Sequence, residues 1–186
     1  MQKHLVDFFF NIRYFIYMNK IYFSKLNDKA IIPSKKDEDA GYDIYACFDE
    51  DFIIFKPFET HLVPTGIAWA CPPEYYMQIE ERSSTGTKGI KKGAGILDSG
   101  YRGEIKIAIY NSRTNNLILS NLEETILKQK YPEIFKESYL YYNTNKAIAQ
   151  GIIHRVEKFD IQELTYDNLL SIPSERGTNG WGSSGK

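Results

Sequence analysis

Short apolar segments recur along most of this chain, and turn residues separate them. Phe52–Phe55 is one such segment, and His61–Trp69 divides into two pieces around Pro64 and Gly66. Tyr75–Ile79 is another. Segments of about 4–8 residues between turn residues are typical of strands, and an aromatic content of 15% favours the same structure. The sequence therefore predicts an all-β sandwich or barrel.

Composition narrows the classes of function. A formal net charge of −1 over 186 residues provides no basic field for a nucleic-acid backbone, so no nucleic-acid partner is expected. The only cysteines, Cys47 and Cys71, are too few for a disulfide framework or a zinc set. They predict a reducing compartment, and hence a cytoplasmic protein.

The N-terminal stretch Leu5–Tyr17 is rich in aromatic residues, but Asp7, Asn11 and Arg13 interrupt it. It is too short and too polar to span a bilayer, and it lacks a signal-peptide cleavage site, so no membrane partner is expected. We interpret residues 1–17 as a leader outside a single β domain at 18–186, with Met18 as an alternative start. An amphipathic cap on the fold is the other interpretation.

The stretch Gly95–Ile105 combines an acid, a turn and an aromatic residue. An apolar run ends in Asp98, Ser99-Gly100 has turn chemistry, and Tyr101 leads into an alternating segment. This order predicts a β-hairpin with a carboxylate beside its turn and a ring three residues further on.

The segment Glu81–Gly89 contains Arg82, Ser83, Ser84 and two glycines. A guanidinium, short hydroxyls and exposed backbone N–H groups suit an oxyanion such as phosphate. A polar loop in which Ser83 or Ser84 caps a helix explains the same residues. The segment alone leaves both interpretations open.

Two polar side chains interrupt strand-like segments. In Ala40–Ala46, Tyr42 and Ile44 share one face, so Asp43 points away from the core or into a cleft. Gln150 lies within the apolar segment 146–153, where most such amides are satisfied core or edge groups.

The β pattern stops between residues 115 and 144. Ser120–Glu123 resembles a capping box, Leu122, Ile126 and Leu127 have helical spacing, and Pro132 ends or kinks the helix. We therefore expect an α-helical insertion at about 115–144, without assigned chemistry.

The C-terminal segment 176–186 is rich in glycine and is expected to be mobile without ligand. A flexible linker is the simplest interpretation. Arg176, Trp181 and two serines instead indicate a lid that closes on a nucleotide.

Five of these stretches, in order, resemble the trimeric dUTPase family. They are 40–46, Arg82–Ser84 with Gly86, 93–98 with 101–104, 148–150 and 176–185. The resemblance extends over about residues 21–185, apart from the insertion. It implies a distorted jelly-roll-like β-barrel that hydrolyses dUTP to dUMP and pyrophosphate. That reaction supplies dUMP for thymidylate synthesis and keeps uracil out of DNA.

The resemblance also implies roles for individual residues. Asp98 corresponds to the general base that activates water, and Tyr101 to the ring beneath the deoxyribose. The backbone of Ala94, Gly95, Ile96 and Leu97 corresponds to the strand that pairs with uracil. The triphosphate binders correspond to Arg82, Ser83, Ser84 and Gln150. In the arm, Arg176 corresponds to the γ-phosphate clamp, Trp181 to the ring stacked on uracil, and Gly182, Ser183 and Ser184 to further substrate contacts.

Magnesium and a homotrimer are implied by the same resemblance. Mg²⁺ is expected to bridge the phosphates, with Asp43 reaching it only through water. Active sites are expected to be shared between subunits, with an exchanged C-terminal arm. The chain departs from the family pattern at Glu81, where proline is frequent, at Gly100, where an acid is common, and at Asn145-Lys146.

Two alternatives belong to other functional classes. A deaminase of dCTP shares the fold, but it needs a glutamate at a position that corresponds to Ala108. The second is a non-catalytic module that senses nucleotide or binds a partner, with the insertion as its contact surface.

Overall fold

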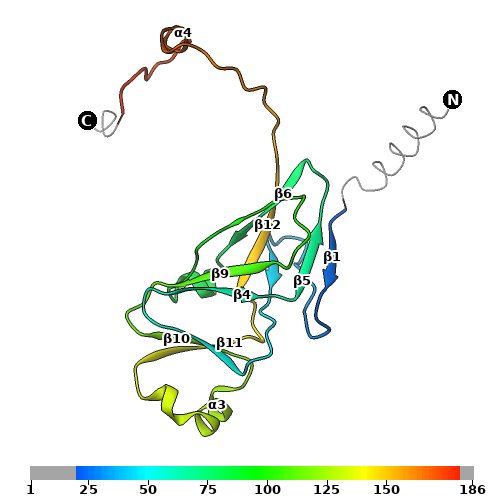
Figure 1. Cartoon of the computed structure of the whole chain (residues 1–186), viewed down its shortest axis with the longest axis vertical. Helices are drawn as coiled ribbons and strands as arrows, with labels where there is room; N and C mark the ends of the chain where they lie inside the picture. Colours follow the sequence, from blue (N-terminus) through cyan, green and yellow to red (C-terminus); the bar gives the residue numbers. More distant parts are fainter. Residues whose placement is uncertain (1–19, 181–186) are drawn as a thin grey trace, which may run out of the picture. The chain divides into compact units, whose positions relative to one another are not determined.

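The computed structural model describes residues 20–180, and the chain divides into two compact units, 1–156 and 157–186 (Figure 1). The predicted leader at 1–17 lies outside the described residues, as do residues 181–186 of the arm. The domain boundaries proposed from the sequence therefore stay predictions.

The first unit is built from strands, as the turn-punctuated sequence predicted. The described strands are β1 (Tyr22–Lys25), β2 (Tyr42–Ile44), β3 (Phe52–Phe55), β4 (Thr60–Pro64), β5 (Ile67–Ala70), β6 (Tyr75–Glu80), β7 (Ile90–Lys92), β8 (Ile96–Leu97), β9 (Lys106–Asn111), β10 (Asn116–Ser120), β11 (Tyr139–Asn143) and β12 (Ala149–Arg155). The short helices are α2 (Ser83–Gly86), α3 (Glu124–Lys130), η1 (Pro132–Phe135) and, in the second unit, α4 (Tyr166–Leu170).

The strands described within residues 20–180 form four small sheets. Their orders are β1-β5, β11-β10-β3, β2-β12-β6-β8 and β4-β9-β7. The pair β10–β11 is parallel, and the other described pairs are antiparallel. The sheet β2-β12-β6-β8 matters most for function, because its outer strands carry two different groups of predicted site residues.

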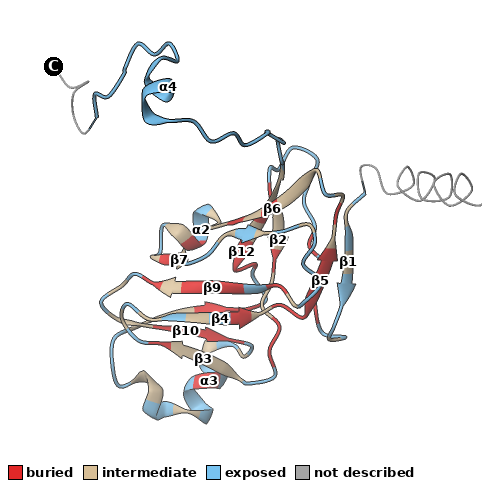
Figure 2. Cartoon of the chain, turned by 45° about the horizontal axis from the view of Figure 1, so that its top comes forward, coloured by how far each residue is buried: buried red, intermediate tan, exposed pale blue. Residues whose placement is uncertain are grey.

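One hydrophobic core joins the sheets (Figure 2). The inward positions of successive strands supply it, as the alternation in the sequence predicts. Phe55, Val63, Met77, Ile107 and Leu117 are among its fully buried members. The prediction of an all-β fold is confirmed.

The predicted hairpin around Asp98 is wrong in its pairing. β8 pairs with β6, whereas β9 pairs with β4 and β7. The segment between them is held elsewhere: Ile105 N donates to Ile67 O at 2.7 Å, and Gly66 N donates to the Glu104 carboxylate at 2.9 Å. The turn residues were recognised correctly, but these contacts to distant residues separate the two strands.

The predicted helical insertion is helical only in its middle. α3 and η1 span residues 124–135, while β10 and β11 occupy the two ends of the predicted range. The capping box at Ser120–Glu123 is also wrong, because Ser120 ends β10 and its hydroxyl donates to Asp51 O at 2.8 Å. A parallel partner strand makes residues 139–143 a strand, and local periodicity does not reveal such a partner.

The second unit, 157–186, is described up to residue 180. Its helix α4 is capped by Thr165, whose hydroxyl accepts from Asn168 N at 3.3 Å. Within residues 20–180, every helix is too short or too polar to cross a bilayer.

Candidate active site

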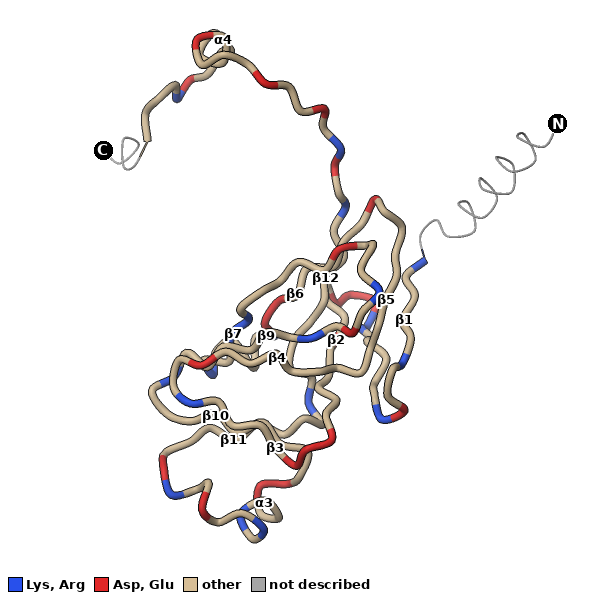
Figure 3. The backbone as a smooth tube through the Cα atoms, in the orientation of Figure 1, with Lys and Arg blue, Asp and Glu red and all other residues tan. Residues whose placement is uncertain are grey.

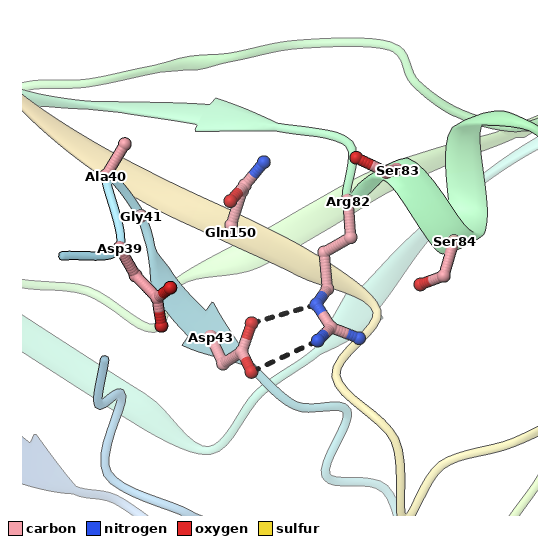
Figure 4. Close-up of a pocket in the computed structure, with 8 residues that line it drawn as sticks. All are labelled: Asp39, Ala40, Gly41, Asp43, Arg82, Ser83, Ser84 and Gln150. Atoms are coloured by element: carbon pink, nitrogen blue, oxygen red, sulfur yellow. Dashed lines mark hydrogen bonds and ion pairs between the residues drawn. The ribbon is translucent and has the colours of Figure 1, made fainter. Parts of the chain in front are cut away.

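Four of the residues predicted to bind phosphate line one open pocket, which we call the phosphate pocket (Figure 4). It has a volume of about 350 Å³. β2 and the loop before it, β12, and the turn into α2 supply its lining: Asp39, Ala40, Gly41, Asp43, Arg82, Ser83, Ser84 and Gln150. Four predicted phosphate binders thus converge from distant parts of the sequence, with Asp43 beside them.

A bidentate ion pair organises the phosphate pocket. Arg82 Nε lies 2.8 Å from Asp43 Oδ1, and Arg82 Nη2 donates to Asp43 Oδ2 at 3.3 Å. Both side chains are about one-third exposed, at 32% and 34%. Asp43 therefore faces the pocket, as its position in the strand predicted, and it orients the Arg82 guanidinium.

The first turn of α2 leaves two serine hydroxyls at the pocket. The cap bond comes from Thr85, whose Oγ1 accepts from Arg82 N at 3.1 Å. Ser83 and Ser84 are therefore not the capping residues, and both line the phosphate pocket. The capping interpretation of Ser83 and Ser84 is therefore wrong, and their role in phosphate binding stays a prediction.

The Gln150 side chain is hydrogen-bonded within the sheet and also lines the phosphate pocket. Its Nε2 donates to Glu81 O at 2.8 Å, so the amide is satisfied as an ordinary strand residue would be. The same side chain lines the phosphate pocket between Gly41 and Arg82 (Figure 4). The bond to Glu81 fixes the amide beside the turn that carries Arg82.

Tyr142 is a neighbour of the pocket that the sequence did not reveal. Its hydroxyl donates to Ala147 O at 2.7 Å, and Arg82 Nη1 approaches the same carbonyl at 3.5 Å. Burial raises the pKa of the Tyr142 phenol, and the Arg82 charge partly offsets that rise. The missed strand β11 thus places a neutral phenol behind the guanidinium.

A second surface carries the acid and the ring; we call it the base face. Its lining residues are Leu62, Ile96, Leu97, Asp98, Tyr101, Glu104 and Lys106. Ile96 is 65% exposed, Leu62 64% and Tyr101 45%, which is unusual for large apolar and aromatic side chains. Among the described residues, no hydrogen bond or ion pair engages the Asp98 carboxylate, which is exposed.

The local fold fixes the Tyr101 ring. Its hydroxyl donates to Glu104 O at 2.9 Å. A Cβ added to Gly103 would lie 2.5 Å from the Tyr101 hydroxyl oxygen and 2.7 Å from its ring carbon, so the ring needs a glycine there. The ring is thus held in position while much of it stays open.

The two surfaces lie at opposite edges of one sheet. The phosphate pocket includes β2, the base face includes β8, and β12 and β6 lie between them. Three strand spacings correspond to about 14 Å. The two linings share no residue. A single chain therefore keeps Asp98 and Arg82 in separate surfaces.

The remaining predicted site residues are distributed as follows. Ala94 and Gly95 precede β8, and Gly95 O accepts from Ile79 N at 2.7 Å. Arg176 belongs to the second unit and is exposed. The final group lies outside the described residues: Trp181, Gly182, Ser183 and Ser184.

The core is all-β. A pocket with an arginine and two hydroxyls lies at one sheet edge, and a surface with an aromatic ring and a carboxylate lies at the other. These features define a nucleotide-binding protein of the jelly-roll-like class. Residues 27–123 match the family model described as dUTPase. The chain belongs to the dUTPase family, and the prediction of a dUTP-hydrolysing enzyme is thereby confirmed at the level of the family.

Individual relatives agree with this assignment. The deoxyuridine 5'-triphosphate nucleotidohydrolase of Leptospira interrogans serogroup Icterohaemorrhagiae serovar copenhageni is 32% identical over 170 residues, which cover 89% of this chain and 99% of that protein. A Staphylococcus bacteriophage 80alpha dUTPase solved with dUPNHPP superposes with a TM-score of 0.68 at 23% identity, covering 91% of this chain and all of that one. A mutant dUTPase of S. aureus phage phi11, solved to describe a structural Mg(II) ion, gives 0.60 at 20% identity over 78% of this chain and 97% of that one. At these identities the two structures support the fold alone.

Proposed function

We propose that the chain hydrolyses dUTP to dUMP and pyrophosphate by attack of water on the α-phosphorus. Asp98 accepts a proton from that water, the new bond forms between the water oxygen and phosphorus, and the bond to the bridging oxygen of pyrophosphate breaks. The observation that carries this proposal is the exposed Asp98 carboxylate, unpaired among the described residues and beside a fixed aromatic ring. A carboxylate held by a cation would be a poorer proton acceptor.

The base face suits a deoxyribonucleoside. The Tyr101 ring supports the sugar and leaves no room for a 2′-hydroxyl, while the backbone of Ala94–Leu97 pairs with the uracil edge. Cytosine would leave the polar groups of that strand unpaired, and the methyl group of thymine would not fit the closed pocket. Trp181 of the arm supplies a second ring against the base.

The phosphate pocket suits the triphosphate. Arg82 supplies charge, Ser83 and Ser84 supply hydroxyl donors, and the amide of Gln150 lines the same space. Because Asp43 holds two nitrogens of the guanidinium, Arg82 is oriented before substrate arrives. In the arm, Arg176 binds the γ-phosphate, and Gly182, Ser183 and Ser184 complete the contacts.

The complete active site forms between chains of a homotrimer. In this proposal the phosphate pocket of one chain meets the base face of a second chain, and a C-terminal arm closes over both. The position of the two surfaces at opposite sheet edges supports this arrangement. The exposed Leu62, Ile96 and Tyr101 support it too, because contact with another chain would cover them.

The residues present fit a magnesium ion that the chain holds through water. Both Asp43 oxygens are engaged by Arg82, and within residues 20–180 no three acidic, histidine or cysteine side chains are grouped as direct ligands. Asp39 and Asp43 line the phosphate pocket and offer carboxylate oxygens to bound water. When bound there, magnesium supplies positive charge that neutralises the phosphate oxygens.

Residue Ala108 argues against deamination of dCTP. It lies in β9 between Ile107 and Ile109, is buried, and pairs with Leu62, so this position offers no carboxylate. A cytoplasmic location is part of the proposal and rests on the two free thiols of Cys47 and Cys71.

Product analysis tests the proposal. The purified chain is incubated with dUTP, dTTP, UTP or dCTP in the presence of magnesium. We expect dUMP and pyrophosphate from dUTP, with far slower turnover of the others. Release of ammonia from dCTP, or orthophosphate from dUTP, would contradict it.

A further inference from the structure

Lys92, the last residue of β7, connects the two parts of the chain that carry the proposed site. Its backbone N donates to Glu81 Oε1 at 3.1 Å, and its Nζ donates to Glu80 Oε1 at 2.9 Å. Glu80 and Glu81 immediately precede Arg82, while Lys92 immediately precedes the segment 93–97. We call this group of three residues the Lys92 brace.

The Lys92 side chain covers Gly95. A Cβ added to Gly95 would lie 2.7 Å from Lys92 Nζ and 3.0 Å from Ile79 O. The ammonium therefore occupies the space next to the backbone of the residue that precedes β8. β8 has only two residues. The segment is otherwise held by the bond from Ile79 N to Gly95 O and by the pairing of Ile96 and Leu97 with Gln78 and Met77.

Glu80 connects the segment 93–97 to the inner strands of the sheet, β6 and β12. Its carboxylate also accepts from Gln78 Nε2, and Gln78 lies opposite Ile96 in the β6–β8 pair. In the other direction, Glu80 lies opposite Gln150 in the β12–β6 pair. The carboxylate thus stands between the strand of the base face and the strand of the phosphate pocket.

The ion pair between Lys92 and Glu80 is less exposed to solvent than an ordinary surface ion pair, so its attraction is screened less. The side chains of Lys92 and Glu80 are both 26% exposed, compared with 72% and 76% for Lys29 and Asp49. Solvent screens half-buried pairs less than exposed pairs. The Gln78 and Lys92 hydrogen bonds lower the pKa of Glu80, so the carboxylate is charged at neutral pH.

We propose that Lys92 and Glu80 are positioning residues for nucleobase binding, which set the place of Gly95–Leu97 without touching substrate. This inference rests on the proposed function, because it assumes that the segment pairs with uracil. Glu81 adds a second link, because its carboxylate accepts from the Lys92 backbone N–H.

Separate probes for the two surfaces test the inference. Deoxyuridine reports on the base face and inorganic tripolyphosphate on the phosphate pocket, and calorimetry measures both without turnover. For Lys92→Met, we expect deoxyuridine to bind about tenfold more weakly and tripolyphosphate to bind within about twofold of wild type. In kinetics, KM for dUTP should rise about tenfold while kcat changes less than about threefold.

Three further variants sharpen the test. Glu80→Gln removes the other partner and should reproduce the effect, while Lys92→Arg should retain most of the deoxyuridine affinity. Lys29→Met removes the exposed ion pair with Asp49 and serves as the matched control, with wild-type binding of both probes. A melting curve for each variant checks that it is folded.

The outcomes separate the two proposals. Equal weakening of both probes, or unchanged deoxyuridine binding in both Lys92→Met and Glu80→Gln, would overturn the positioning role. Failure of the wild-type chain to turn over dUTP would instead contradict the proposed function, whatever the binding results.

Discussion

The phosphate pocket and the base face differ in how far hydrogen bonds and ion pairs within the chain fix their polar side chains. In the phosphate pocket, Asp43 orients Arg82 and Glu81 holds Gln150, so the polar groups are fixed before ligand binds. On the base face, Ile96 and Leu62 are more than 60% exposed, and the Asp98 carboxylate is unpaired among the described residues.

In the proposed active site shared between chains, this difference gives the two halves different requirements. A pocket of buried and half-buried hydrogen bonds keeps its shape in an isolated chain, because its partners are all internal. A surface with exposed apolar side chains gains stability when another chain covers it. Figure 3 shows acidic and basic residues dispersed along the described backbone, so a strong field of one sign is not what would bring chains together. The predictions below test each half separately.

The largest effect is expected from removing the arm. Truncation before Arg176 should abolish dUTP turnover, because neither half holds the γ-phosphate or closes over the base. A steady-state assay measures the loss, and an unchanged melting temperature shows that the β domain remains folded. Retained activity would mean that the two halves suffice without a lid.

The next effect concerns the base face. Asp98→Asn should lower kcat by a factor of about 10² or more, because an amide cannot accept the proton from water. Affinity for a non-hydrolysable dUTP analogue should stay near wild type, since shape and hydrogen-bonding size are kept. A variant that turns over at the normal rate would show that Asp98 is not the base.

Substitutions in the phosphate pocket should change KM more than kcat, whereas Asp98→Asn changes kcat. Arg82→Ala should lower kcat/KM by about 10–100-fold, mainly through KM, because charge-assisted hydrogen bonds to the triphosphate are lost. Arg82→Lys is the matched variant, since it keeps the charge but cannot form the bidentate pair with Asp43. If tripolyphosphate binds Arg82→Ala as tightly as wild type, the pocket has been assigned wrongly.

The smallest effect is expected in the pH dependence of the melting temperature. It comes from Glu80, whose carboxylate lies between the strands of the two surfaces. The pKa of Glu80 is lower in the folded chain than its ordinary value, through its bonds to Gln78 and Lys92. Its contribution to stability is therefore complete above the ordinary value, near 4.5, and is lost as pH falls through the lower folded value. Glu80→Gln should reduce the acid-induced fall in melting temperature by about 1–2 °C. An identical fall in both proteins would contradict this assignment.

The same comparison explains what the sequence could predict. Strand segments such as Phe52–Phe55 follow from local alternation, and the anion chemistry of Arg82 with its serines follows from residue type. The pairing of β8 with β6 instead depends on contacts far along the chain, such as Ile105 to Ile67.

The strand β11 and its Tyr142 were missed for a related reason. Residues 139–143 become a strand only through their parallel partner β10, and Tyr142 reaches Ala147 beside the phosphate pocket only in the folded chain. Family resemblance gave roles to individual residues, but it did not reveal that Lys92 links the two halves.

Mixing two impaired chains tests the central claim, that each active site combines halves from different chains. The Asp98→Asn and Arg82→Ala variants are combined by unfolding and refolding together, and turnover is then measured at a dUTP concentration well below the wild-type KM, where both variants alone are slow. Random assembly of a closed oligomer should give about a quarter of the sites two intact halves, so activity should rise to about a quarter of wild type. If each site lies within one chain, every site keeps one altered half, and the mixture should be no more active than the two variants measured separately.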